Sequence, residues 1–528
     1  MDVKIKKPAE NTEEIRFEDL DLVYVFSFDL GAPVKAKDLG EWFSRSKLVE
    51  GIWIPPSEYR PAPEFVRRKA KELEIKNAEK ISEEELIKNE KLMEEINRAH
   101  AMFLSILSED CKVCDPEYLE LGRYVRLKLT DLNLRIEDPE FSYLNGLRCE
   151  LYLLLHDAGV GIVTVWIHLN SYLSTDDLIK IENKLDEAKC IIEDSFGSTS
   201  NAKSLDEFIF QNIIDPLRTA AVFSSEYGGF DAAVNALRRG DITTDKLKKK
   251  LRSLYRTIFS FVCIRKHRCQ DGCITAEDAV ERHSREIYGI LMNYENWKYA
   301  QTDAIKEVIK NNLSSCVDYV IFVAIEASLF IGSVILYERL KSAEDQELEY
   351  RRTELNLVLP MEFLLLSDRI LDVYISIYRS KLAELRERRR RGEAMKPSEI
   401  IEIREELMYG LEEYNNVLFF VKDPHRKIME HGKESLMLSR KVNTIISGLQ
   451  ELSDMVRTFY EEEILRRQEG LSRMQTILTV LFGIFGVFQA LEFLGPMLGL
   501  PNAIAITSAI FLPYPIYKLL SSLYGKKM

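Results

Sequence analysis

The pattern of apolar and polar positions changes along the chain, and its first part mixes two periodicities. Leu22–Asp29 is rich in Val, Tyr and Phe, which is typical of a β-strand. Arg148–Leu155 and Val160–His168 are two further strand-like runs, and Asp157–Gly159 between them predicts the turn of a β-hairpin. Charged segments with apolar residues at helical spacing separate such runs. We therefore expect an α/β domain over residues 1–270.

Two helical segments are predicted inside this domain. Pro63–Leu107 places apolar residues at helical spacing among many Lys and Glu, which predicts one or two surface helices. Ser174 is followed by Thr175 and two aspartates, a pattern typical of an N-cap with acids in the first helical turn. We expect that helix to run to about Ile192.

After about residue 275 the strand signals stop, and residues 271–473 are expected to form a helical domain. Glu277–Asn311 and Glu362–Arg391 both show helical spacing of apolar residues. Pro397 and Ser398 precede a further helical stretch that extends to Phe420. Long helices should therefore follow the α/β domain.

One apolar run in this helical domain requires a choice between two interpretations. Val320–Tyr337 is 18 residues long with Glu326 as its single charge, which just reaches membrane-spanning length. A third span would place Lys518 and the lysines near the carboxyl end outside, against the positive-inside tendency. We interpret the run as a buried core helix, with a membrane span as the alternative.

The most regular pattern in the sequence precedes the carboxyl-terminal apolar segments. Apolar residues follow at spacings of four and three over three heptads: Leu438, Val442, Ile445, Leu449, Leu452, Val456 and Phe459. This spacing predicts a coiled-coil seam or a close helix-bundle face. Asp423-Pro424 resembles a helix start, and Pro496 is the next proline, so one long helix should include a stalk over about 424–473. The stalk either associates with copies of itself or packs within its own subunit.

Two nearly uncharged segments at the end of the chain predict a transmembrane hairpin within residues 474–522. Ile477–Leu494 would make about 27 Å of helix, close to the hydrocarbon thickness of a bilayer. A turn at Gly495–Gly499 leads to a second apolar stretch, about Leu500–Tyr517. Arginines precede the first span and lysines follow the second, while the connecting loop has neither. This favours a multi-pass protein of the cell membrane with both termini in the cytoplasm.

Composition narrows the classes of function. The 528 residues carry a formal net charge of −13, which argues against nucleic acid as the main partner. With 46% hydrophobic and 30% charged residues, the chain is neither disordered nor a membrane protein with many spans. Nucleotide-binding and hydrolase motifs such as the P-loop, HExxH and GxSxG do not occur in the sequence. We therefore do not expect an enzyme.

A cytosolic α/β domain, a stalk helix that continues into a first span and a short-looped hairpin together resemble CorA-type magnesium transporters. The local resemblance is strongest over Leu449–Leu494, especially in Leu471–Thr479. It implies an oligomer, a homopentamer in that family, in a lipid bilayer, with Mg²⁺ or another divalent cation as the transported ion. The family also carries Gly-Met-Asn at the outer mouth of its pore. Here Gly495 and Met497 remain as a remnant around Pro496, and the asparagine is absent.

A stripe of small and polar residues on the first span supplies candidate pore-lining residues. They are Thr476, Thr479, Gly483, Gly486, Gln489 and Glu492, with Ala490 on the same helical face as the glycines. Glu492 lies at the outer end of the span, where a carboxylate facing water is far less costly than one facing lipid. Small residues on a membrane helix also indicate close helix–helix packing, and that alternative stays open.

Cysteines supply the candidate metal ligands. Cys111 and Cys114 form a CxxC pair, and Cys269 and Cys273 form a wider pair near His267. Two such pairs are able to complete one structural Zn²⁺ site, although ordinary reduced cysteines are the alternative. Two functions therefore remain: an oligomeric channel or transporter for divalent cations with a cytosolic regulatory domain, or a membrane-anchored interaction or signalling protein that does not conduct.

Overall fold

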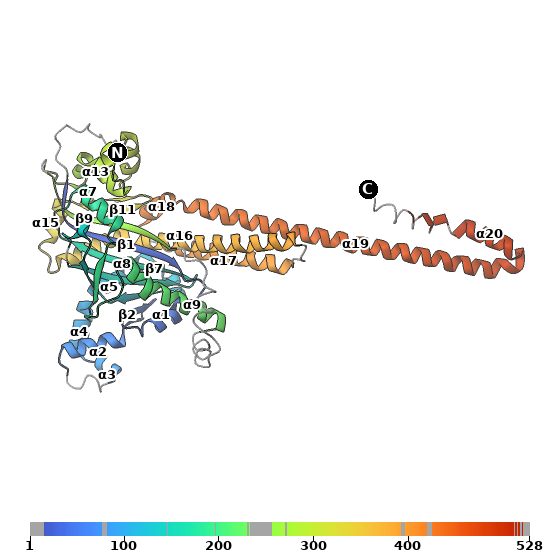
Figure 1. Cartoon of the computed structure of the whole chain (residues 1–528), viewed down its shortest axis with the longest axis horizontal. Coiled ribbons are helices and arrows are strands. Elements are labelled where there is room, and N and C mark those ends of the chain that lie inside the picture. The colour runs from blue at the N-terminus through green and yellow to red at the C-terminus, as the bar shows by residue number, and fades with distance from the viewer. Residues whose placement is uncertain are drawn as a thin grey trace. The chain divides into compact units, whose positions relative to one another are not determined.

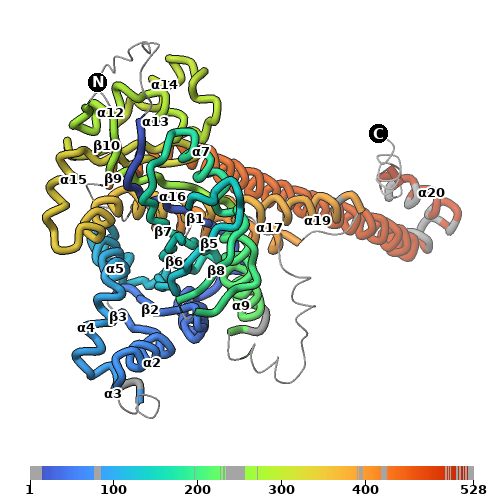
Figure 2. Tube along the Cα trace, turned by 60° about the vertical axis from the view of Figure 1, so that its left-hand side comes forward, coloured from blue at the N-terminus to red at the C-terminus, as the bar shows by residue number. Residues whose placement is uncertain are grey.

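The computed structural model describes most of the chain, which divides into two compact units (Figures 1 and 2). The sheet unit comprises Met1–Ser380 and Glu406–Ile445, and the helical unit comprises Lys381–Glu405 and Ile446–Met528. The described residues are 15–511 without 57, 76–81, 145, 196, 230–231, 233–255, 270–271, 392–395 and 420–424, together with 513–514, 516–517 and 520.

The sheet unit is built on one mixed sheet of eleven strands among the described residues. Its main path runs β10-β11-β9-β1-β7-β6-β4-β2-β3, and β5 pairs with β6 and β8. Neighbours are antiparallel, except that β11 runs parallel to β9. The strands are β1 (Arg16–Asp29), β2 (Val49–Ile54), β3 (Glu58–Pro61), β4 (Tyr124–Leu129), β5 (Leu132–Ile136), β6 (Leu147–His156), β7 (Val160–Leu169), β8 (Cys190–Asp194), β9 (Arg256–Arg268), β10 (Tyr319–Val323) and β11 (Ala327–Gly332). This confirms the α/β character expected for the first part of the chain.

The hairpin predicted from the sequence is present as β6 and β7, in a register that pairs Leu153 with Val163. Its turn depends on Gly159, whose φ of +78° is a conformation that favours glycine. A Cβ at this position would lie 2.3 Å from the carbonyl oxygen of Ala32. The glycine therefore fixes both the turn and the close approach of the segment that follows β1.

One face of the sheet is apolar, because successive side chains of a strand point to opposite faces and alternate residues of β1 supply the core. In β1, Leu22, Tyr24 and Phe26 point into the main hydrophobic core. Most short helices lie in this unit, and α2–α4 gather near β2 while α12–α14 gather near β10 and β11 (Figure 2). The short helices are α1 (Ala36–Phe43), α2 (Pro63–Glu72), α3 (Glu83–Ile87), α4 (Glu90–Ala99), α5 (Ala101–Val113), α6 (Pro116–Leu121), α7 (Thr175–Lys184), α8 (Leu205–Ile209), α9 (Asp215–Tyr227), α12 (Ala276–Arg282), α13 (Ser284–Leu291), α14 (Thr302–Ile309) and α15 (Val334–Leu340).

The second face of the sheet carries buried charges and meets the long helix α16 (Gln346–Arg390). Arg265 on β9 donates to Glu354 on that helix with a nitrogen–oxygen distance of 2.8 Å. Further along the same helix, Glu362 accepts a hydrogen bond from the hydroxyl group of Thr164 on β7, with an oxygen–oxygen distance of 2.5 Å. Asp21, which lies between Leu20 and Leu22 on β1, also belongs to this face. A polar helix–sheet contact therefore occupies the side opposite the apolar core.

The interpretation of Val320–Tyr337 as a buried core helix is wrong. The segment forms the antiparallel pair β10 and β11, and then begins α15. Its Val, Ile and Phe residues suit a strand that is buried on both faces, and Glu326 lies between the two strands. Since β11 joins β9 in parallel, the segment is part of the sheet and does not cross a membrane.

The helix predicted after Ser174 is present but ends earlier than expected. Ser174 accepts a hydrogen bond from the N–H of Asp177, and the Asp177 carboxylate accepts one from the N–H of Ser174, which completes a capping box. The helix α7 stops at Lys184, and residues from Cys190 form strand β8. Pairing with β5 therefore overrides a helical continuation to Ile192.

Long helices follow the sheet, as expected, but their breaks differ from the prediction. The long ones are α16, α17 (Pro397–Phe419) and α19 (Leu438–Leu498), and the shorter helices α18 (Arg426–Ser435) and α20 (Leu500–Phe511) precede and follow α19. The expected continuous helix from Asp423-Pro424 is interrupted at Met437, whose φ is +54°; the predicted start itself lies outside the described residues. At the other end, α19 passes through Pro496 and stops before Gly499, which has a φ of +80°. The predicted turn at Gly495–Gly499 is therefore reduced to its last residue.

Candidate functional site

The second half of α19 is apolar but not covered by the rest of the chain. Leu438–Phe493 contains a stretch long and apolar enough to cross a membrane, and it is the only such helix in the part of the chain that the structure describes. Only 11% of that stretch is buried. Phe482, Phe485 and Phe488 are 70%, 62% and 65% exposed. A core helix of a soluble protein would hide such side chains, so this surface requires another apolar environment.

The predicted pore-lining residues differ in how much of their surface the rest of the chain covers. Thr476 is 8% exposed, and Thr479, Gly483 and Gly486 are half-buried. Gln489 and Glu492 are exposed. Both threonines direct their hydroxyl groups to carbonyl oxygens one turn earlier, Ser472 and Gln475, which satisfies these polar groups within the helix.

The small-residue stripe is thus the less exposed side of the apolar segment in the single chain. That arrangement is what close helix–helix packing produces. The remnant of the loop motif, Gly495 and Met497, belongs to the last turn of α19, where Pro496 has no N–H to donate. The backbone there is helical and does not form an open loop.

The heptad seam upstream is partly used within the chain. Leu438, Ile445 and Leu452 are at most 1% exposed, whereas the seam residues between them are half-buried. In the helical unit, Arg386 of α16 donates to Glu451 of α19 at 2.8 Å, beside the buried Leu452. The apolar residues that follow the seam, Ile464 and Leu465, are exposed.

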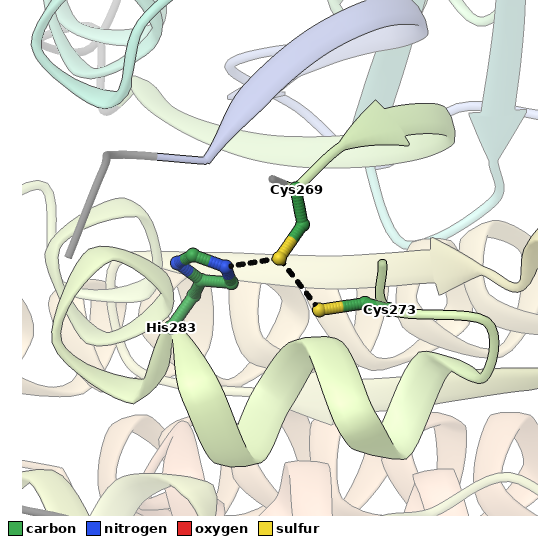
Figure 3. Close-up of side chains that lie close together, drawn as sticks. All are labelled: Cys269, Cys273 and His283. Carbon is green, nitrogen blue, oxygen red and sulfur yellow. Dashed lines mark hydrogen bonds between the residues drawn. The ribbon is translucent and has the colours of Figure 1, made fainter. Parts of the chain in front are cut away.

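A compact group of metal-ligand residues lies at the end of β9 (Figure 3). Cys269 follows the strand, Cys273 precedes the N-cap of α12, and His283 joins α12 to α13. The Sγ atoms of the two cysteines are 2.8 Å apart, and Nε2 of His283 lies 3.1 Å from Sγ of Cys269. All three ligand atoms lie within 4.8 Å of one another. Cys273 and His283 are buried, and Cys269 is partly exposed.

Two further side chains complete the surroundings of this group. Oε1 of Glu286 lies 3.2 Å from Nδ1 of His283, one helical turn along. His267, two residues before Cys269, is 6% exposed, and among the residues that the structure describes neither of its ring nitrogens has a hydrogen-bond partner. Burial and the neighbouring His283 lower the pKa of His267 to about 4, which keeps the ring neutral at pH 7.

The four cysteines predicted as a shared zinc site do not meet. Cys111 is exposed on α5, and Cys114 is buried at its end, with Sγ 3.8 Å from the hydroxyl group of Tyr124. Sequence reasoning identified Cys269 and Cys273 but missed His283. The spacing from Cys273 to His283 was visible, but only the bend between α12 and α13 places that ring beside the sulfurs.

Another buried histidine, His156 at the end of β6, is explained by its packing. The N–H of Ala158 donates to Nδ1 at 3.0 Å, so the proton of the neutral ring belongs on Nε2. Nε2 lies 3.2 Å from the hydroxyl group of Tyr118. Burial lowers the pKa of His156 to about 3, so the ring is neutral and both nitrogens are satisfied at pH 7. Its contacts are those of a structural residue in the hairpin.

Comparisons with protein-family models, with curated proteins and with solved structures find no match to this chain.

Proposed function

We propose that this protein is an oligomeric membrane protein similar in layout to CorA-like divalent-cation channels, with a cytosolic α/β domain that regulates it. The observation that carries the proposal is α19, a single helix of 61 residues whose first part packs against other helices and whose later part is apolar and exposed. A helix of this kind connects a water-soluble domain directly to a bilayer.

The charges around the apolar segments support one membrane topology. Arg466, Arg467 and Arg473 precede the apolar part of α19, and Lys518 follows α20. Such charges favour the cytoplasmic side. The chain therefore crosses the bilayer twice, through the end of α19 and through α20 with the residues after it, and both termini are cytoplasmic.

The ion path in this proposal follows the small and polar stripe of α19. In an oligomer, Thr479, Gly483 and Gly486 of each copy converge around the symmetry axis. Glu492 is exposed near the end of the helix, and a ring of such carboxylates concentrates cations at an outer mouth. It partly replaces the asparagine that the CorA motif would supply.

A non-conducting membrane anchor is the second candidate, and a specific observation favours it. The stripe that would line the pore is the side of α19 already least exposed in a single chain, with Thr476 at 8%. If the apolar segment after Gly499 covers that side, the stripe serves packing within the subunit. The protein would then hold its α/β domain at the membrane for interaction or signalling.

Flux measurements distinguish the two candidates. The purified full chain is reconstituted into liposomes that contain a divalent-cation indicator, and entry of Mg²⁺, Co²⁺ and Ni²⁺ is followed. A channel gives entry above that of protein-free liposomes, and Glu492→Gln lowers it several-fold while the particle mass in detergent is unchanged. Glu469→Gln, on the exposed part of α19 before the apolar segment, is the matched control and leaves entry unchanged.

The outcomes are separable. Wild-type liposomes that take up no cation above background, from a complex that is nevertheless oligomeric, contradict the channel and support the anchor. A monomer in detergent contradicts any pore on a symmetry axis. Extraction of the protein from membranes by alkaline carbonate without detergent contradicts both candidates, because neither holds if the chain does not span the bilayer.

A further inference from the structure

We propose that Cys269, Cys273, His283 and His267 form a structural Zn²⁺ site that joins the end of β9 to the bend between α12 and α13. The inference stands apart from the proposed membrane function, since all four residues belong to the sheet unit. Three of the four ligand atoms are already gathered (Figure 3).

The observed distances between the ligand atoms are shorter than those of an occupied tetrahedral site. Zn–S bonds of about 2.3 Å and Zn–N bonds of about 2.0 Å place neighbouring ligand atoms roughly 3.5 to 3.8 Å apart. Nε2 of His283 is 3.1 Å from Sγ of Cys269, and the two Sγ atoms are 2.8 Å apart. Binding therefore requires the sulfurs to separate by about 1 Å.

The second independent feature is the carboxylate behind His283. Glu286 Oε1 lies 3.2 Å from Nδ1, so Nδ1 carries the proton and the lone pair of Nε2 points toward the sulfurs. Zinc-binding histidines almost always have such a partner on the other ring nitrogen, because it fixes the tautomer and the ring orientation. Glu286 belongs to the first turn of α13, so the same helix sets both groups.

His267 is the residue that completes the site. It is 6% exposed, and both of its ring nitrogens are without a hydrogen bond to any described part of the chain. A buried polar ring normally finds a partner, and a metal bond would provide one for His267. His267 is near the end of β9, and Cys269 directly follows that strand, so His267 is two residues from one of the gathered cysteines.

The ligand chemistry selects the metal class. Two thiolates with imidazole suit Zn²⁺, whereas Mg²⁺ and Ca²⁺ prefer oxygen ligands. The site is therefore distinct from any path for a transported hard cation. Because Cys273 and His283 are buried and four protein ligands leave no open position, the expected role is structural. The metal would link Cys269 to His283 across the intervening segment. In that segment, the carbonyl oxygen of Ile274 accepts a hydrogen bond from the backbone N–H of Val334.

The test uses the full chain, purified in detergent under reducing conditions. Elemental analysis is expected to find about one zinc for each chain. Replacement of the metal by Co²⁺ is expected to give the thiolate charge-transfer absorption and the strong visible bands of a tetrahedral site. Removal of the metal by a strong chelator is expected to lower the melting temperature of the sheet unit by several degrees, and added zinc restores it. All of these measurements use the wild-type protein, so they do not depend on whether a variant folds.

Variants then assign the ligands. Cys273→Ser and His283→Ala are expected to abolish the cobalt spectrum, and His267→Ala to change it to that of a site with a water ligand. Cys111→Ser is the matched control, because it removes an exposed cysteine outside the group and leaves zinc content unchanged. Circular dichroism checks that each variant keeps its secondary structure.

Three results would overturn the proposal. The first is reduced wild-type protein that binds neither zinc nor cobalt. The second is a cobalt spectrum that survives both Cys273→Ser and His283→Ala. The third is a Cys269–Cys273 disulfide, detected by mass spectrometry of protein kept in reductant, together with an absence of bound metal. That last result would replace the metal site with a disulfide that resists reduction.

Discussion

Arg126 on β4 and Glu362 on α16 form an ion pair of 2.8 Å in which both side chains are at most 3% exposed. The same guanidinium group donates to Asp110 at the end of α5, at 3.0 Å through one of its nitrogens. Arg126 therefore connects the charged face of the sheet to both α5 and α16. Buried charges are costly unless they are paired, so this contact specifies where α16 lies along the sheet.

The first prediction concerns this arginine. Arg126→Leu leaves the carboxylates of Asp110 and Glu362 buried without their shared partner. We expect the free energy of unfolding to fall by about 3–5 kcal/mol, as for other broken buried pairs. Urea unfolding of the full chain in detergent, followed by the fluorescence of Trp166 and the other tryptophans, measures it. Arg98→Leu removes an exposed pair with Glu95 and should change stability by less than about 1 kcal/mol.

A loss for Arg126→Leu no larger than that for Arg98→Leu would show that the buried pair contributes no more than a surface pair. Combining Arg126→Leu with Asp110→Leu and Glu362→Leu separates pairing from packing. If the unpaired carboxylates cause the loss, the triple variant recovers much of it.

The second prediction follows from Glu182, which is buried on α7 and accepts a hydrogen bond from Ser260 at 2.5 Å. Burial raises the pKa of Glu182 from an ordinary 4.5 to about 8. Between these two pH values the folded protein holds a proton that the unfolded chain has lost. The free energy of unfolding therefore falls as the pH rises from about 5 to 8.

Glu182→Gln removes this pH dependence because the amide resembles the protonated carboxyl group. At pH 8 we expect the variant to be more stable than the wild type by about 2–4 kcal/mol, since one pKa unit corresponds to about 1.4 kcal/mol. Near pH 4.5 the difference should vanish. Melting temperatures across this pH range provide the test, with Glu193→Gln on the exposed side of β8 as control. A difference that does not change with pH would mean that Glu182 keeps an ordinary pKa.

The third prediction compares two glycines inside helices. A Cβ at Gly410 of α17 would lie 2.3 Å from the ring of Tyr374 on α16, whereas a Cβ at Gly470 of α19 would meet nothing within 4 Å. Gly410→Ala should therefore destabilise the protein by about 1–3 kcal/mol through overpacking. Gly470→Ala should be neutral or stabilising by up to about 1 kcal/mol, because alanine favours the helix.

Thermal unfolding in detergent distinguishes these two substitutions, since both place the same methyl group in a helix. Equal effects would mean that α16 and α17 separate easily enough to admit a side chain at Gly410. A second substitution tests the cause of the loss. If the clash with the ring of Tyr374 destabilises Gly410→Ala, adding Tyr374→Leu should restore part of the lost stability.

The hairpin of β6 and β7 and the cap of α7 were predictable because their signals are local. Ser174 with Asp177 makes a capping box from residues three apart, and Asp157–Gly159 makes a turn. Val320–Tyr337 could not be assigned in the same way. A continuous apolar run fits a buried helix or two buried strands equally well, and only the pairing of β11 with β9 decides between them.

The candidate metal site shows the same limit in another form. Cys269 and Cys273 are close in sequence, so their spacing alone indicated a metal-binding pair. His283 is brought to them by a helix and a bend, whereas His267 is already close to Cys269 in the sequence. The helix break at Met437 could not be predicted from the sequence either, because this residue with a positive φ is neither a glycine nor next to a proline.

The last prediction separates packing within the subunit from assembly of the proposed oligomer. Leu452 is fully buried in the single chain, so Leu452→Asp should disturb the helical unit itself. Ile464 and Leu465 are 54% and 59% exposed between the seam and the apolar segment. If these side chains pack between copies, the double change of both to Asp places like charges at each interface and dissociates the complex.

Light scattering in detergent should then report a particle mass reduced to that of one chain. Circular dichroism should stay unchanged for this double variant and should lose helical signal for Leu452→Asp. An oligomer that survives the double change would place its contacts elsewhere, and a wild-type particle that is already monomeric would remove the proposed stalk assembly altogether.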